Sequence, residues 1–135
     1  MEVEEAKFHK TLKVSTAIAL VLLVVSLANI ELSLYQKFQW LDIPMHMAGG
    51  VWLSLLFFYI FCYRYPIFDY KKSVFVSILA SLAFVALLGL LWEFYEYGTE
   101  LIFHPTWPMT IADTLGDLMN DLIGAFLASL WFLFW

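Results

Sequence analysis

The chain has 135 residues, of which 63% are hydrophobic and 14% charged, and its formal net charge is −5. Soluble domains are about 45–50% apolar and about 25% charged, so this composition excludes a soluble globular protein and indicates an integral membrane protein. The seven Lys and Arg residues form no basic patch, which argues against nucleic-acid binding, and the single Cys62 cannot form an internal disulfide.

Four segments are long and apolar enough to cross a bilayer, which takes about 20 residues of helix. They cover approximately residues 14–34, 43–62, 74–95 and 111–135. Because the connections are short, we expect each helix to lie antiparallel beside the next. The sequence contains no linker or internal repeat, so we predict a single all-α transmembrane domain, residues 1–135, folded as an antiparallel four-helix bundle.

The first span follows Lys13, and Ser26–Ala28 loosely resembles a signal-peptide cleavage site. Apolar residues continue to Leu34, which favours an uncleaved helix; cleavage would leave three helices in the same orientation. Near the end of this span, Asn29 and Glu31 point in roughly opposite directions, because residues two apart do not share a helix face. We expect Glu31 either to support a polar site inside the bundle or to reach out to the membrane interface.

The second span begins with Asp42, Pro44 and His46, followed by Gly49 and Gly50. Asp42 before Pro44 is typical of a helix N-cap, and it is also in place to support a polar site. His46 lies one turn inside the span, where a neutral imidazole can bind a metal ion or pass a proton, although a lone histidine is often a structural hydrogen bonder. The two glycines allow a neighbouring helix to approach closely.

The third span ends with Glu93, Glu96 and Glu100, whose spacing places them on one helix face. Counting along the helix puts Glu93 near the membrane boundary, Glu96 at the interface and Glu100 in water. Two glutamates one turn apart on an inward face can present carboxylates to a cation. We therefore predict Glu93 and Glu96 as metal ligands, with Glu93 also catalytic, and Glu100 as part of a solvated helix end.

The fourth span carries Asp113, Asp117 and Asp121 at intervals of four residues, with Asn120 on the same face. Thr110 and Asp113 resemble a helix-start capping box, which is the simplest role for Asp113. Asp117 and Asp121 lie too far from the helix start to cap it, and charged groups within a bilayer cost about 3 kcal/mol each on insertion scales. We therefore predict Asp117 and Asp121 as catalytic residues and metal ligands, supported by Asp113 and Asn120.

The charges are distributed unequally between the two ends of the spans. Six of the seven Lys and Arg residues lie in the N-terminal tail and the second connection, and only Lys37 lies in the first connection. The positive-inside rule then predicts a multi-pass protein of the cell (inner) membrane with both termini in the cytoplasm. Eight of the twelve acidic residues lie at the opposite, outward end: Glu31, Asp42, Glu93, Glu96, Glu100, Asp113, Asp117 and Asp121. The loop containing His104 and Trp107 is expected to form an interfacial anchor or a lid over them.

Several carboxylates that converge in a medium of low dielectric cannot all stay ionised unless cations or shared protons compensate them. His46 and Lys37 are the available internal partners, which leaves most of the negative charge uncompensated. We therefore predict a bound divalent cation or a shared proton network. Oxygen ligands with one histidine suit Mg, Mn or Ca, and suit Zn less well.

Three groups of residues form a recognisable pattern: Asp42-x3-His46 with Gly49-Gly50, Trp92-Glu93-x2-Glu96, and Asp113-Thr114-x2-Asp117-Leu118-x2-Asp121-x2-Gly124-Ala125. The pattern resembles the small bacterial inner-membrane proteins of the YjdF-like type, which are similar to the broader VanZ-like family named for teicoplanin resistance. The resemblance covers roughly residues 42–125. The VanZ-like pattern usually has Asn at position 121, Gln at position 96 and a basic residue before the aspartates, so this chain is closer to the YjdF-like proteins. The resemblance implies the fold and the membrane location more than a reaction.

Three functions fit these features. The first is an enzyme in which a metal ion held by the acidic and histidine residues acts on a lipid-linked or other envelope substrate. The second is a proton or ion relay, which needs a polar path to the cytoplasm, whereas the inner halves of the spans are nearly all apolar. The third is a noncatalytic subunit of a homo- or hetero-oligomer, in which the polar cluster fixes helix packing and partner proteins supply cations. In every case membrane lipids surround the protein.

Overall fold

The computed structural model describes residues 2–103 and 110–134. Within these ranges the chain is helical and contains no strand. The four long helices are α1 (Glu2–Leu32), α3 (Asp42–Phe58), α4 (Val74–Phe103) and α5 (Ile111–Phe134). Each helix matches one of the predicted spans, and four helical segments are long and apolar enough to cross a membrane: α1, α4, α5, and α3 together with the turns on either side of it, Gln39–Arg64. The prediction of an all-α membrane bundle is confirmed. The loop predicted to form an interfacial anchor or a lid, residues 104–109, lies outside the described residues.

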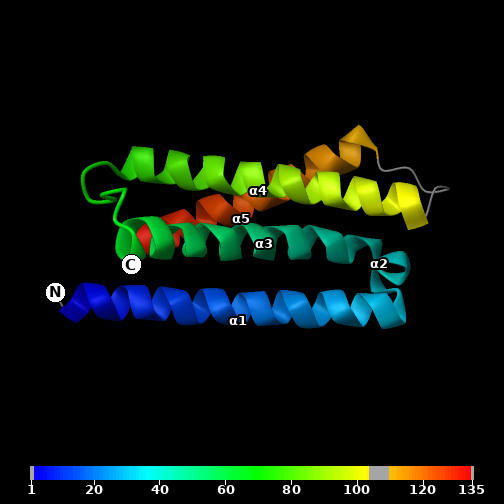
Figure 1. Ribbon diagram of the computed structural model, residues 1–135, viewed down its shortest axis with the longest axis horizontal. Coiled ribbons are helices and arrows are strands. Elements are labelled where there is room, and N and C mark those ends of the chain that lie inside the picture. Colours follow the sequence, from blue (N-terminus) through cyan, green and yellow to red (C-terminus); the bar gives the residue numbers. More distant parts are fainter. Residues whose placement is uncertain (1, 104–109, 135) are drawn as a thin grey trace.

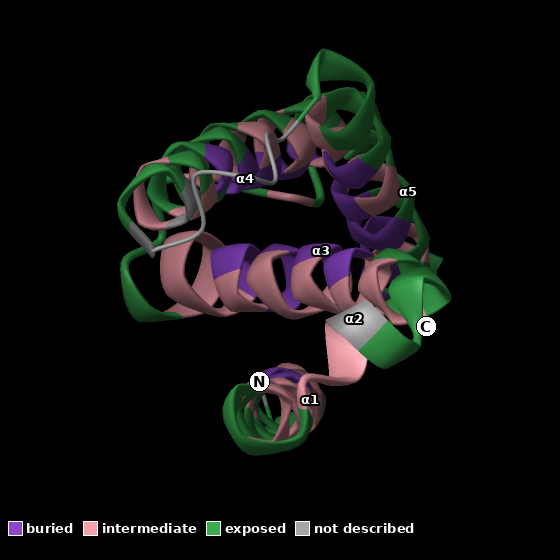
Figure 2. Ribbon diagram, turned by 90° about the vertical axis from the view of Figure 1, so that its right-hand side faces the viewer, coloured by how far each residue is buried: buried purple, intermediate pink, exposed green. Residues whose placement is uncertain are grey.

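The four long helices alternate in direction, so both ends of the chain lie at one end of the bundle (Figure 1). Helix α3 contacts each of the other three long helices and packs most closely with α5, which also contacts α4. Helix α1 lies beside α3, apart from the group formed by α3, α4 and α5 (Figure 2). The first turns of α3 and α5 therefore lie at the same end of the bundle as the last turns of α4.

A short reversal joins α1 to α3 through α2 (Leu34–Lys37) and the 3-10 turn η1 (Gln39–Leu41). The reversal begins at Ser33, whose backbone is left-handed with φ of 52°. The Asn29 side chain accepts a hydrogen bond of 2.9 Å from the backbone N–H of Tyr35, which ties the reversal to the end of α1. Asn29 therefore has a local structural role.

At the end that holds both termini, aromatic rings join three helices. Phe58 of α3 stacks on Phe132 of α5 with ring centroids 4.3 Å apart, and Phe8 of α1 lies 5.5 Å from Phe132. All three side chains are buried. A π-helical turn, η2 (Tyr59–Arg64), follows α3 at this end. This core fixes the start of α1 against α3 and α5.

Halfway along the bundle, small residues bring the helices close together. The Ser54 hydroxyl lies 2.9 Å from that of Ser81 and 3.1 Å from that of Ser129, so one hydrogen-bonded group joins α3, α4 and α5. Nearer the end opposite both termini, a Cβ atom at Gly50 would collide with the backbone carbonyl of Asp121. The predicted close approach at Gly50 is therefore confirmed, and α5 is the neighbour. Interhelical contact of this kind fixes the height of the α5 aspartates relative to α3.

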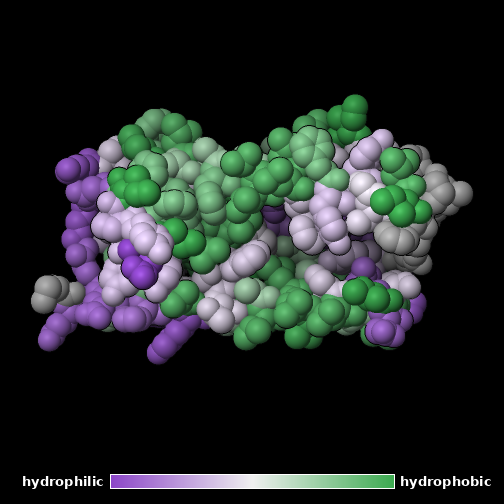
Figure 3. All heavy atoms as spheres, viewed as in Figure 1, coloured by the Kyte–Doolittle hydropathy of each residue, from purple (hydrophilic) through white to green (hydrophobic). Residues whose placement is uncertain are grey.

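The outside of the bundle has the character expected of a surface in lipid. Large apolar side chains are exposed along the helices, among them Leu23 and Leu27 of α1 and Leu87 and Leu91 of α4. Apolar atoms cover the flank of the molecule, and hydrophilic atoms gather at the end that holds the N-terminus (Figure 3). Such a surface is stable where acyl chains replace water.

Candidate functional site

A cluster of acidic residues and one histidine lies inside the bundle at the end opposite both termini. The first turns of α3 contribute His46, the second half of α4 contributes Glu93 and Glu96, and the first half of α5 contributes Asp117 and Asp121. Exposed fractions are 7% for His46, 3% for Glu93, 7% for Asp117 and 5% for Asp121, while Glu96 is half-buried. Four ionisable side chains from three helices are therefore withdrawn from the surface together.

The two nitrogens of the His46 ring face different carboxylates. Nδ1 lies 3.5 Å from Oδ1 of Asp121. Nε2 lies 3.6 Å from Oδ1 of Asp42 and 3.9 Å from Oδ1 of Asp117. Asp42 reaches the ring because it precedes His46 by four residues and so shares its helix face. The imidazole is thus flanked by carboxylates from both α3 and α5.

Asp42 has a different local role from the one its sequence position indicates. Helix α3 begins at Asp42 itself, the cap residue is Leu41, and no side chain caps the helix start. The N-cap interpretation is therefore wrong. The helix begins one residue earlier than expected, because the 3-10 turn η1 leads directly into it. The carboxylate of Asp42 is left free to face His46.

Two groups of three residues have the spacing needed to hold a metal ion. One consists of Asp42, His46 and Asp117, and the other of His46, Glu93 and Glu96. In each group, one potential ligand atom per residue lies within 4.8 Å of the other two. His46 belongs to both groups, so they form two halves of one cluster.

Glu93 is the most deeply withdrawn acid of the cluster. Neither of its carboxylate oxygens has a hydrogen-bond partner among the described residues. The Thr114 hydroxyl lies near the Glu93 carboxylate but does not form a hydrogen bond of acceptable geometry with either oxygen. Leaving a buried polar group unpaired costs about 1–3 kcal/mol, and more when the group is charged. A bound cation or a proton on the carboxylate would remove this cost at Glu93.

Glycines surround the Asp121 carboxylate. A Cβ atom at Gly89 of α4 would lie 2.6 Å from Oδ2 of Asp121, and one at Gly49 of α3 would lie 3.6 Å from Oδ1. A side chain at Gly89 would therefore displace the carboxylate from His46. The motifs in the sequence do not point to Gly89. The available signal was a glycine one turn before Glu93, within the otherwise apolar stretch of residues 82–92.

Three of the predicted supporting residues belong to neither ligand group. Asp113 is exposed, and its backbone N–H donates a hydrogen bond of 3.1 Å to the Thr110 hydroxyl, so Thr110 caps α5 as the sequence indicated. Asn120 is half-buried. Glu31 is exposed on α1, which agrees with the interfacial alternative rather than with a place inside the bundle.

Tyr35, in the reversal before α3, is a further polar residue near the site, and no motif in the sequence points to it. Burial raises the pKa of its phenol, and the carboxylates of Asp42 and Glu96 raise it further. The phenol therefore remains protonated at neutral pH and can donate a hydrogen bond. Lys37, the cation that the sequence offers at this end, is exposed.

Comparison with known proteins gives a family but no reaction. No curated protein and no solved structure matches the chain significantly. The family described as "Predicted membrane protein (DUF2238)" matches residues 3–135, nearly the whole chain. A match of this extent, together with four helices able to span a membrane, identifies the chain as a member of that family of predicted membrane proteins.

Proposed function

We propose that this protein binds a divalent metal ion between Asp42, His46 and Asp117 and uses it for chemistry on a lipid-linked or other envelope substrate. The observation that carries the proposal is the spacing around Nε2 of His46. Its separations of 3.6 and 3.9 Å from the two aspartate oxygens are too long for hydrogen bonds. Ligand atoms that share one ion at about 2.1–2.4 Å lie about 3.0–3.9 Å apart in octahedral or tetrahedral coordination.

The remaining acids have distinct parts in this proposal. Asp121 faces the opposite nitrogen, and a carboxylate on one nitrogen fixes the tautomer and orientation of a histidine that binds metal through the other. Glu96 belongs with Glu93 to the second group around His46 and would supply a further oxygen ligand on that side of the site. Glu93, with both oxygens unpaired, is placed to bind the ion or to accept a proton. Oxygen ligands with one imidazole suit Mg, Mn or Ca, and less well Zn.

The chemistry proposed for this site is hydrolytic or group transfer. A divalent ion polarises a phosphate or carbonyl oxygen and lowers the pKa of bound water. Glu93 would then act as the catalytic base that takes the proton from the attacking water, with Asp117 and Asp121 keeping His46 and the ion in place. A substrate linked to a lipid is supported by the shape of the flank, which is hollowed near its middle and shows hydrophilic atoms at the bottom of the hollow (Figure 3).

The location proposed for this chemistry is the outer face of the bacterial inner membrane. The excess of Lys and Arg at the end with both termini supports a cytoplasmic position for that end. The resemblance of residues 42–125 to YjdF-like proteins, and more distantly to VanZ-like proteins, supports the inner membrane. The site would then face the periplasmic side, where envelope substrates are found.

A noncatalytic role is the second candidate, and one observation favours it. Both nitrogens of His46 face carboxylates of α5, so the cluster also links two helices that pack closely. Interhelical hydrogen bonds in membranes contribute about 0.6 kcal/mol on average, which is small beside the cost of several buried acids. A proton or ion relay has less support, because it needs a polar path from the cluster to the end that holds both termini. In the described part of the bundle, the fully buried rings of Phe58 and Phe132 lie across that path.

Metal content tests the proposal directly. Protein purified without chelators should contain close to one equivalent of a divalent metal, measured by inductively coupled plasma mass spectrometry. The Asp117→Asn variant should lose this metal. Asp69→Asn is the matched control, since Asp69 is an exposed acid at the opposite end of the bundle. Equal metal content in all three proteins, after incubation with Mn, Mg, Ca and Zn, would leave the noncatalytic role as the better explanation.

A further inference from the structure

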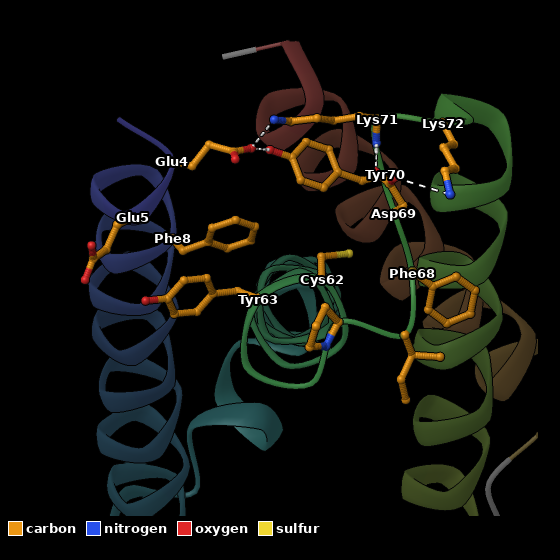
Figure 4. A pocket seen from close by; sticks show the side chains of 12 residues that line it. Glu4, Glu5, Phe8, Cys62, Tyr63, Phe68, Asp69, Tyr70, Lys71 and Lys72 are labelled. Carbon is orange, nitrogen blue, oxygen red and sulfur yellow. Dashed lines mark hydrogen bonds and ion pairs between the residues drawn. The ribbon is translucent and has the colours of Figure 1, made fainter. Parts of the chain in front are cut away.

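A polar cavity lies at the end of the bundle that holds both termini, away from the acidic cluster. It is formed by the start of α1, the turn η2 and the connection 65–73, and it has a volume of about 770 Å³ (Figure 4). The cavity lies at the level where two membrane spans end, because Glu4 begins the apolar span of α1 and Arg64 ends that of α3. Lipid headgroups meet water at this level.

Aromatic side chains line the inner part of the cavity. The rings of Phe8 and Tyr63 are stacked with centroids 4.7 Å apart, and Phe68 and Cys62 lie on the side towards α4 (Figure 4). Aromatic residues are enriched at membrane interfaces, where their rings contact the glycerol and upper acyl region of lipids. This part of the cavity can therefore hold the apolar neighbour of a headgroup.

Charges of both signs surround the opening. Oε1 of Glu4 accepts a hydrogen bond of 2.7 Å from the Tyr70 hydroxyl and pairs with Lys71. Burial and the contact with Glu4 raise the pKa of Tyr70, which keeps this hydroxyl a donor. Lys72 lies 3.8 Å from Asp69, a loose pair between two exposed side chains that retain most of their hydrogen-bonding capacity.

We infer that this cavity binds the headgroup of a zwitterionic phospholipid that carries a primary ammonium, such as phosphatidylethanolamine. Lys72 would contact the phosphate, and Asp69 beside it would receive the ammonium. Three acids and two lysines line the cavity, so an anionic headgroup would meet a rim of slightly negative charge. A quaternary ammonium cannot donate hydrogen bonds to these carboxylates, which favours ethanolamine over choline. The volume lies within the range of about 300–1,000 Å³ that is usual for small ligand sites.

Cys62 provides a native reporter, because it is the single cysteine of the chain and lines the cavity. The full chain is placed in nanodiscs of phosphatidylglycerol mixed with an equal amount of phosphatidylethanolamine or phosphatidylcholine, and the rate of maleimide labelling is measured. We expect labelling to be about threefold slower with phosphatidylethanolamine. A lipid that occupies about two-thirds of the sites would leave the thiol accessible in the remaining third. Equal rates in the two mixtures would overturn the inference.

Lys72→Ala should abolish the difference between the two lipids, and Lys37→Ala, an exposed lysine at the opposite end, should preserve it. Melting temperatures of the variants establish that they fold. A difference that survives in Lys72→Ala would overturn the assignment of the phosphate contact and with it the site. Protection by soluble phosphoethanolamine in phosphatidylcholine nanodiscs, equal to that by the lipid, would also contradict a site for membrane lipid.

Discussion

At His46, the two ring nitrogens face carboxylates whose surroundings differ. Asp121 sits against Nδ1 with glycines on two sides, whereas Asp117 and Asp42 share the side of Nε2. From their spacing along α5, Asp117 and Asp121 look equivalent, since both lie on one helix face. In the structure their roles differ, because Asp117 faces Nε2 of His46 and Asp121 faces Nδ1.

This separation predicts different metal responses for two isosteric changes. Asp117→Asn should abolish binding of the preferred divalent ion, because it removes a ligand charge. Asp121→Asn should weaken binding by about 10–100-fold and leave one ion per chain, as expected when the partner of a metal-binding histidine is altered. Titration calorimetry in detergent measures both. Equal loss in the two variants would make Asp121 a ligand, as its spacing in the sequence indicated.

Binding should also depend on pH. Carboxylate and imidazole ligands must be deprotonated to hold a metal, so the ion should raise the melting temperature at neutral pH and have a diminishing effect as the pH falls. A cluster that shares protons instead would give no response to metal, and its stability would be unchanged or higher at mildly acidic pH. Thermal unfolding with and without the ion between neutral and acidic pH distinguishes the two, and absence of both effects would favour a purely structural cluster.

Gly89 offers a test that leaves every ionisable group in place. Gly89→Ala adds a Cβ atom 2.6 Å from Oδ2 of Asp121, so the carboxylate or α4 must move, and metal affinity should fall. Gly98→Ala in the same helix is the matched control, because no atom lies within 4 Å of its added Cβ. That control should be neutral or stabilising by up to about 1 kcal/mol, the usual helix preference of Ala over Gly. Equal metal affinity in the two variants would show that the space left by Gly89 does not position the Asp121 carboxylate.

At the scale of helices, hydrophobic length was enough to predict four helices and their order. It did not predict that α1 begins at Glu2, because the charged residues of its first turns are stabilised by distant partners, such as Tyr70 for Glu4. The shared depth of His46 and the carboxylates followed from counting residues. Which nitrogen faces which acid, and the group of Ser54, Ser81 and Ser129, depend on helix rotation that periodicity in a nearly all-apolar span does not define.

The hydrogen bond from Tyr70 to Glu4, which joins α1 to the connection before α4, should weaken at alkaline pH. Because burial and Glu4 raise the pKa of Tyr70, the folded protein holds the phenol proton more tightly than the unfolded chain does. Its stabilising contribution is therefore complete below the unfolded value of about 10 and is lost as the pH rises through the higher folded value. Tyr70→Phe should have a lower melting temperature at neutral pH and a flatter alkaline profile. Identical profiles for the two proteins would contradict this role.

At the scale of the whole molecule, the charge pattern predicts orientation. Six cationic residues at the end with both termini should keep that end in the cytoplasm. Reporter fusions after Trp135 and within Phe103–Met109 should therefore report opposite sides, with the C-terminal fusion active as a cytoplasmic reporter. A C-terminus outside the cytoplasm would move the acidic cluster to the inner face and exclude a periplasmic substrate.

Among the described side chains of α1, the buried ones are Phe8, Thr11 and Ser15, all in its first half, whereas most large side chains from Leu20 onwards are exposed. The second half of α1 is therefore joined to the bundle mainly through the reversal that carries Tyr35 and leads to Asp42. We expect a change in bilayer thickness that tilts this half of the helix to move the reversal, and with it the carboxylate of Asp42 beside His46.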